Sequence, residues 1–243
     1  MKDLWKYLII GCSVIISVIV LSFAITYYGR SKDTIAVTGL GETTFTSDMI
    51  VWQGRISLEN YDKLAGYRQM EKNQQKVAQY LRENGVSDDE VTFSFINTDK
   101  NFTSVYSDNG NYIGSRFVGY GFSETFTVTS YNVEKIERIS REISTLISQN
   151  IDVDSYTPDY YYTKLDDLKL ELIEKASKDA RLRAENIVEN AGGHLGKASN
   201  ARLGVFQITS VTGEEEYSYG GTFNTSSKEK KARITVRMEY KLK

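Results

Sequence analysis

The 243-residue sequence is poor in the side chains that most often build catalytic and metal sites, since it contains one Cys, one His and one Pro. A single cysteine excludes an intrachain disulfide framework and a cysteine-rich metal site. A single histidine excludes a histidine cluster for zinc, and no partner for a Ser-His triad is evident around it. Neither sign of charge dominates: the 30 Lys and Arg against 32 Asp and Glu leave a net charge of −2, which argues against nucleic-acid binding. Seventeen Tyr with so little proline favour an ordered, β-rich chain.

One long uncharged stretch lies near the N-terminus, at residues 7–28. About 20 apolar residues in a helix span the hydrocarbon core of a bilayer. Trp5, Tyr7 and Tyr27 lie at the ends of the stretch, where aromatic rings favour the membrane interface. A cleavable signal peptide is the alternative, but its apolar region is shorter, about 7–15 residues, and it ends in a small-residue cleavage site that this sequence lacks. We therefore predict an uncleaved transmembrane anchor.

The orientation of this anchor rests on the length of the chain on each side. Lys2 and Lys6 precede the span and Arg30 and Lys32 follow it, so the positive charges are balanced. The short N-terminal end favours a cytoplasmic N-terminus, with the larger part of the chain outside the cytoplasm, in the periplasm. The predicted order is a short cytoplasmic tail, a transmembrane anchor, a linker and one large domain, at residues 1–6, 7–28, 29–33 and 34–243.

Hydrophobic periodicity predicts the fold of the large domain. Apolar residues at helical spacing predict helices over residues 62–83, 132–148 and 164–191. Period-2 alternation predicts strands with one buried face, at residues 50–59, 118–128 and 233–242, with shorter strands at 34–39, 91–97, 151–157 and 200–211. Polar stretches at 98–112 and 212–230 predict loops. This order favours an α+β fold with a mainly antiparallel sheet, helices packed on one face and two βαβ-like halves.

No residue pattern identifies a catalytic, cofactor-binding or metal-binding site. Gly39-Leu40-Gly41 lacks the third glycine of a dinucleotide motif and predicts a backbone bend between two strands. His194 follows a helix end, where a cation complements the helix dipole. Residues 214–216, three glutamates, lack the spacing of a calcium loop and predict a solvated loop.

Tyrosines gather in two places, and two interpretations stay open for them. Residues 160–162 are three consecutive tyrosines, and Tyr217 and Tyr219 lie in the second predicted loop. Tyrosine is enriched at recognition surfaces, so either segment predicts a contact surface for a carbohydrate or a protein, or else strand and edge packing.

Several segments resemble the SIMPL domain family, a family long classed as a domain of unknown function. Residues 35–42, IAVTGLGE, resemble the opening V-x-G-x-G-E strand of the family. Residues 176–185, ASKDARLRAE, resemble its A-x-x-x-A-R-x-[KR]-A-E helix, and Gly192 to Lys197 resemble the G-x-x-L-G-K that follows. Residues 119–122, GYGF, and the closing strand at 234–240 extend the resemblance over most of residues 34–243. This chain has Ser47-Asp48 where many members have Pro-Asp, and an anchor where many have a cleavable signal.

The resemblance implies a bacterial cell-envelope protein, with some relatives similar to ring-forming oligomers and with no established catalytic residues. We expect a membrane-anchored, non-enzymatic envelope protein without a cofactor, which self-associates or scaffolds an envelope protein partner. The self-association is expected to use an unpaired edge of the final strand, 233–242, and the Tyr-rich segment before it. The alternatives are an envelope ligand-binding or sensor subunit and a hydrolase that uses two carboxylates.

Overall fold

The computed structural model describes residues 2–30, 33–212 and 220–242, and the side chains of residues 2–10 and 27–30 lie outside the described part. The described residues form two antiparallel sheets and four α-helices: α1 (Lys2–Arg30), α2 (Lys63–Glu83), α3 (Val133–Glu142) and α4 (Leu165–Asn190). A 3₁₀ helix, η1 (Ile143–Gln149), continues α3. The predicted helices at 62–83, 132–148 and 164–191 are therefore confirmed, and the fold is α+β.

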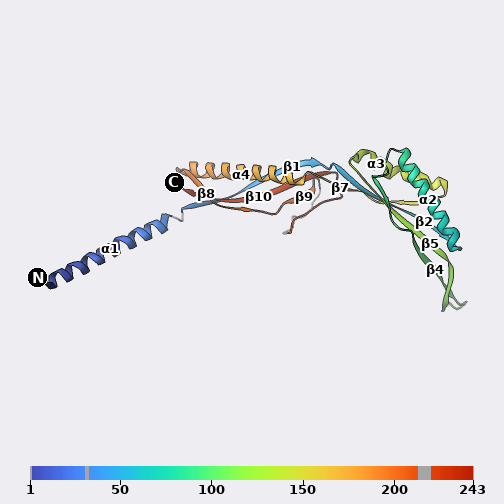
Figure 1. Cartoon of the computed structure of the whole chain (residues 1–243), viewed down its shortest axis with the longest axis horizontal. Helices are drawn as coiled ribbons and strands as arrows, with labels where there is room; N and C mark the ends of the chain where they lie inside the picture. The colour runs from blue at the N-terminus through green and yellow to red at the C-terminus, as the bar shows by residue number, and fades with distance from the viewer. Residues whose placement is uncertain (1, 31–32, 213–219, 243) are drawn as a thin grey trace.

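Helix α1 stands apart from both sheets (Figure 1). All of its described side chains, those of residues 11–26, are exposed. No helix in the described part of the chain combines the length and the apolar character that crossing a membrane requires. The predicted span at residues 7–28 extends past the described side chains at both of its ends.

We call the first sheet the terminal sheet, because its strands come from the two ends of the domain. It has the order β1-β10-β8, and β9 also pairs with β10, all antiparallel; the strands are β1 (Thr34–Thr46), β10 (Glu229–Leu242), β8 (Leu195–Leu203) and β9 (Gln207–Ser210). The final strand is thus central, with a hydrogen-bonded neighbour along each side. The expectation of an unpaired edge on this strand is wrong, and most of the Tyr-rich segment before it lies outside the described residues.

Helix α4 covers one face of the terminal sheet at unusually short range, because small residues face each other across the contact. Ala176, Ala180 and Ala184 are fully buried. A Cβ atom added to Gly39 on β1 would lie 2.1 Å from the carbonyl oxygen of Ala176, and one added to Gly41 would lie 2.1 Å from that of Leu172. Both glycines lie within one continuous strand, so the predicted bend at Gly39-Leu40-Gly41 is wrong. The glycines are there because the helix backbone leaves no room for a side chain.

The second sheet, which we call the middle sheet, is inserted between β1 and α4 in the sequence. Its strand order is β3-β5-β2-β6, with β4 beside β5 and β7 beside β2, and every pairing is antiparallel; the strands are β2 (Met49–Asn60), β3 (Val91–Phe93), β4 (Asn97–Tyr106), β5 (Tyr112–Ser130), β6 (Asp152–Ser155) and β7 (Asp159–Tyr161). The units β2-α2-β3 and β5-α3-β6 form the split arrangement of a β-α-β-β-α-β motif. The two predicted βαβ-like halves correspond to these units.

Helices α2 and α3 cover one face of the middle sheet, where the largest apolar core forms around Trp52, Phe126 and Ile136. Asp62 begins α2 by accepting a 2.7 Å hydrogen bond from the N–H of Ala65, and Gly85, at a φ of 81°, follows its end. In the described part of the chain, no helix packs on the opposite face of the sheet. Each sheet therefore has one covered and one open face, as the alternating strands predicted.

The predicted loop at 98–112 is a long hairpin instead. Strands β4 and β5 pair from Asn97 and Ser123 outward to Tyr106 and Tyr112. Few of these residues pack against a helix, so their sequence shows no alternation of apolar and polar residues. The prediction relied on that alternation, so β4 and the outer part of β5 were missed, whereas the inner part of β5 was predicted as the strand at 118–128.

The two sheets meet at a hydrogen-bonded junction rather than at a free linker. The fully buried Nζ of Lys230, at the start of β10, donates to the carbonyl oxygens of Tyr160 (2.7 Å) and Asn224. The hydroxyl of Tyr160 donates a 2.8 Å hydrogen bond to Glu137 on α3. Burial and this carboxylate raise the pKa of Tyr160 to about 12. Tyr160 is thus a packing residue of the junction. This agrees with the second interpretation of the tyrosines at 160–162, strand and edge packing.

Candidate functional site

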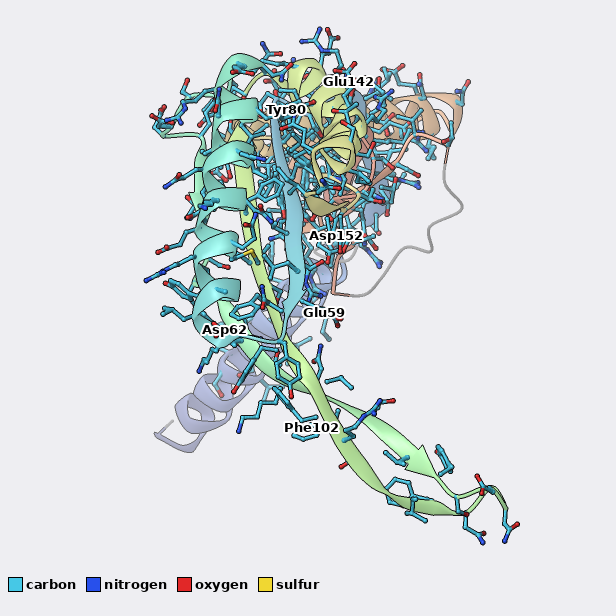
Figure 2. The ribbon with its side chains drawn as sticks, turned by 90° about the vertical axis from the view of Figure 1, so that its right-hand side faces the viewer. Glu59, Asp62, Tyr80, Phe102, Glu142 and Asp152 are labelled. Atoms are coloured by element: carbon cyan, nitrogen blue, oxygen red, sulfur yellow. The ribbon has the colours of Figure 1, made fainter. Side chains whose placement is uncertain are left out.

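The outer part of the β4–β5 hairpin, which we call the arm, extends beyond both helices of the middle sheet. It comprises residues 102–117, past the register shift between Asn101 and Phe102. Gly119 lies at this shift with a φ of 136°, where a Cβ atom would lie 3.1 Å from the carbonyl oxygen of Asn60. Figure 2 shows the arm extending past Asp62 at the start of α2, with Phe102 on the extending part.

Aromatic rings follow the arm outward from the core. Phe117 packs against Tyr120, Tyr61 and Phe102, with ring centroids 5.1, 5.4 and 5.8 Å away. Farther out, the rings of Tyr106 and Tyr112 are 5.9 Å apart. No helix among the described residues covers these rings, and exposed fractions reach 57% for Phe102, 71% for Tyr61 and 60% for both Tyr106 and Tyr112.

A hairpin that extends from the domain and exposes aromatic rings needs a physical explanation. An isolated two-stranded hairpin is marginally stable in water, and large exposed apolar patches mark interaction sites. The aromatic arm is therefore the best candidate for a protein contact surface. The sequence analysis singled out tyrosines elsewhere, because the aromatic residues of the arm are spread over β4 and the outer part of β5, which the sequence did not predict as strands.

A second candidate is a polar cleft on the open face of the middle sheet, with a volume of about 360 Å³. The Ser57 hydroxyl donates to Asp152 at 2.6 Å, and the Asn101 amide donates to Glu59 at 2.8 Å. The side chains that line the cleft are polar or charged at most positions, among them Arg55, Ser57, Glu59, Asp99, Asn101, Ser123 and Asp152. These groups could hold a small polar ligand through hydrogen bonds.

One buried acid lies on the covered face of the same sheet. Glu124 is 2% exposed and lies between Phe122 and Phe126 on β5. Its Oε1 accepts a 3.0 Å hydrogen bond from the amide of Gln74 on α2, whereas its Oε2 has no hydrogen-bond partner. Burial raises the pKa of Glu124 to about 7. Glu124 shares the period-2 positions of its apolar neighbours, so the sequence did hold a signal: an acid at a core position.

The other residues that the sequence analysis considered as possible site residues do not form a site in the described structure. His194 is exposed after the end of α4. The three glutamates at 214–216, with Tyr217 and Tyr219, lie outside the described residues. In the described part of the chain, no group of three or more His, Cys, Asp or Glu side chains is placed to hold a metal ion.

The sequence was also compared with known protein families and with curated proteins. The model of the SIMPL family, described as a protein of unknown function (DUF541), matches residues 35–240. No curated protein matches the chain.

Proposed function

Since the chain belongs to the SIMPL family, we propose that it acts as a membrane-anchored, non-enzymatic cell-envelope protein that self-associates, or scaffolds an envelope partner, through the aromatic arm of its domain. In this proposal, residues 7–28 span the cytoplasmic membrane once and residues 34–243 lie in the periplasm. The observation that carries the proposal is the arm, whose aromatic rings are exposed and extend past the core, uncovered by any helix that the structure describes.

The anchoring part is supported by the sequence and by the isolation of α1. Residues 7–28 carry no charge, and none of the described side chains of α1, those of residues 11–26, belongs to the three apolar cores of the domain. An apolar helix with exposed side chains is unfavourable in water, with a cost of about 25 cal/mol per Å² of apolar surface. A bilayer would remove that cost.

Membrane extraction tests the anchor directly. We expect the full chain to stay in the membrane fraction after washes with high salt and with carbonate, with its N-terminus intact. Protease added from the periplasmic side should digest the domain. Soluble protein that begins near residues 25–30 would show a cleaved signal peptide, and protection of the domain would reverse the orientation.

Self-association is tested on the full chain in detergent by light scattering, with the mass of the bound detergent subtracted. At micromolar concentration we expect a mass that is a multiple of the 27.6 kDa chain. A single-chain mass across the concentration range would contradict self-association and leave scaffolding of another protein as the role of the arm.

The polar cleft supports a second candidate function, an envelope ligand-binding or sensor subunit. Its groups favour a small ligand with several hydroxyl or amino groups, since Arg55 donates and Glu59 and Asp152 accept hydrogen bonds. A hydrolase is less well supported. A carboxyl with a raised pKa would serve as the general acid, but Glu124 faces the covered side of the sheet, away from the cleft on the open side.

A further inference from the structure

A groove of about 590 Å³ runs between α4 and the uncovered part of the terminal sheet. Its floor is apolar, formed by Leu195 and Ala198 of β8 and by Met238 and Tyr240 of β10. Tyr240 is 4% exposed, and its hydroxyl donates a 3.2 Å hydrogen bond to the sulfur of Met238. The groove has the size of a small-molecule site.

The rim of the groove is charged, and its charges do not cancel. On α4, Lys178 pairs with Glu174, and Arg181 pairs with Glu185 at 2.8 Å. On β8, Lys197 has no ion-pair partner among the described residues. The rim therefore carries one uncompensated positive charge beside an apolar floor. This combination fits a ligand with an apolar chain and an anionic head.

Two of the elements that line the groove, β8 and the C-terminal half of α4, lie at the end of the domain from which α1 extends (Figure 1). Leu195 pairs with Leu242 across the sheet, and the N–H of Leu242 donates to the carbonyl oxygen of Asp33 at 2.9 Å. Asp33 is three residues beyond Arg30, the last residue of α1. Three residues reach about 10 Å at most. A bilayer that held α1 would thus lie close to the groove.

We propose that this groove binds one acyl chain of an anionic phospholipid from the adjacent bilayer, with the phosphate beside Lys197. The inference rests on the proposed anchoring by α1 for the source of the lipid. A peptide strand added to the free edge of β8 fits less well. The pairing of β8 with β10 shifts register between Glu239 and Tyr240 and again between Tyr240 and Leu242, and such bulges disrupt an edge for further pairing.

The test uses the full chain in mixed micelles of detergent and phosphatidylglycerol that carries a photoactivatable group on one acyl chain. In micelles the lipid reaches the groove whether or not α1 crosses a bilayer, so this result is independent of the anchor. After irradiation, mass spectrometry of the peptides locates the adducts. We expect them on the peptides that contain Leu195 to Ala198 and Met238 to Tyr240.

Three variants decide the outcome. Ala198→Phe fills the groove at an exposed position and should remove the adducts. Asn200→Phe, on the same strand but on the opposite face of the sheet beside Glu239, should keep them. Lys197→Glu should lower labelling by about fivefold, the effect of one surface charge contact.

Several results would overturn the proposal. These are adducts spread evenly over the domain, equal labelling of the Ala198→Phe and Asn200→Phe variants, or equal labelling by phosphatidylcholine and by phosphatidylglycerol. Flotation of the same protein with vesicles tests the anchor separately, so failure of the anchor and failure of the groove give different results.

Discussion

The backbone N–H of Leu40 on β1 donates a 2.8 Å hydrogen bond to Oδ2 of Asp179 on α4. Because β1 is an edge strand of the terminal sheet, this N–H has no strand to bond to within the described ranges of the chain. The same carboxylate oxygen accepts a 2.8 Å hydrogen bond from Nε of Arg183. Asp179 thus joins the helix to the strand and also occupies a hydrogen-bonding position that an added strand would use.

Replacement of Asp179 should therefore weaken the contact between helix and strand. We expect Asp179→Ala to lower the free energy of unfolding by about 1–2 kcal/mol, since a charged hydrogen bond is lost. Asp179→Asn should cost less, because its amide oxygen still accepts. Asp166→Ala is the control on the same helix, since this carboxylate is 97% exposed. Denaturant unfolding measures all three, and equal midpoints for Asp179→Ala and the control would contradict the assigned role.

The same contact predicts a pH dependence. The hydrogen bonds from Leu40 and Arg183 lower the pKa of Asp179, against the effect of burial. A group with a lowered folded-state pKa stabilises the fold above its unfolded-state pKa, about 3.9 for Asp. This stabilisation is lost as the pH falls through the folded-state value. Unfolding measured at pH 7 and in the acidic range should show a smaller loss for Asp179→Asn than for the wild type.

The packing of α4 predicts a strong effect of one added methyl group. In Gly39→Ala the new Cβ would lie 2.4 Å from the backbone nitrogen of Ala180, so the helix must move away from the sheet. The expected loss is about 1–3 kcal/mol, as for other overpacked sites. Thr38→Ala, at the next and exposed position of the same strand, is the control. A Gly39→Ala variant that melts at the wild-type temperature would contradict the close approach of α4.

For Glu124 we expect the opposite pH dependence of stability, a contribution that is lost as the pH rises. Its folded-state pKa, raised by burial to about 7, lies above the unfolded value of 4.5. The folded state then binds more protons between these values, so stability falls as the pH rises from about 4.5 to about 7, by about 3 kcal/mol in total. Glu124→Gln, which cannot ionise, should remove most of this fall. Glu59→Gln, on the open face of the same sheet, should keep it. Unfolding free energies at pH 5 and pH 8 provide the measurement.

The sequence predicted best those elements whose apolar residues face a core. Helix α4 was placed within one residue at each end, because Leu172, Ala176 and Ala180 repeat at helical spacing and all become buried. The strand β10 was found from its alternation, but the strands that pair with it were not identified, because alternation identifies the buried face of a strand and says nothing about its edges. Its central position depends on β1 and β8, which are distant in the sequence.

The candidate sites were harder to predict, because their residues come together only in the folded chain. Phe102 and Phe117 meet across a hairpin that lacks a core pattern. Glu124 gave a local signal, because an acid lies between Phe122 and Phe126 in the sequence. Which of its carboxylate oxygens finds a hydrogen-bond donor depends on α2, which reaches this position only in the folded chain. Gly39 looked like a bend because the helix that excludes its side chain lies far along the chain.

The most direct test of the account compares how the full chain, in detergent, sediments with and without the aromatic residues of the arm. The double variant Phe102→Ser/Tyr106→Ser removes two exposed rings from the arm, and Tyr131→Ser removes a ring that is 74% exposed outside it. Self-association through the arm predicts that the wild type and Tyr131→Ser sediment as oligomers and that the double variant sediments as a single chain with unchanged unfolding. Equal sedimentation of all three proteins would contradict it.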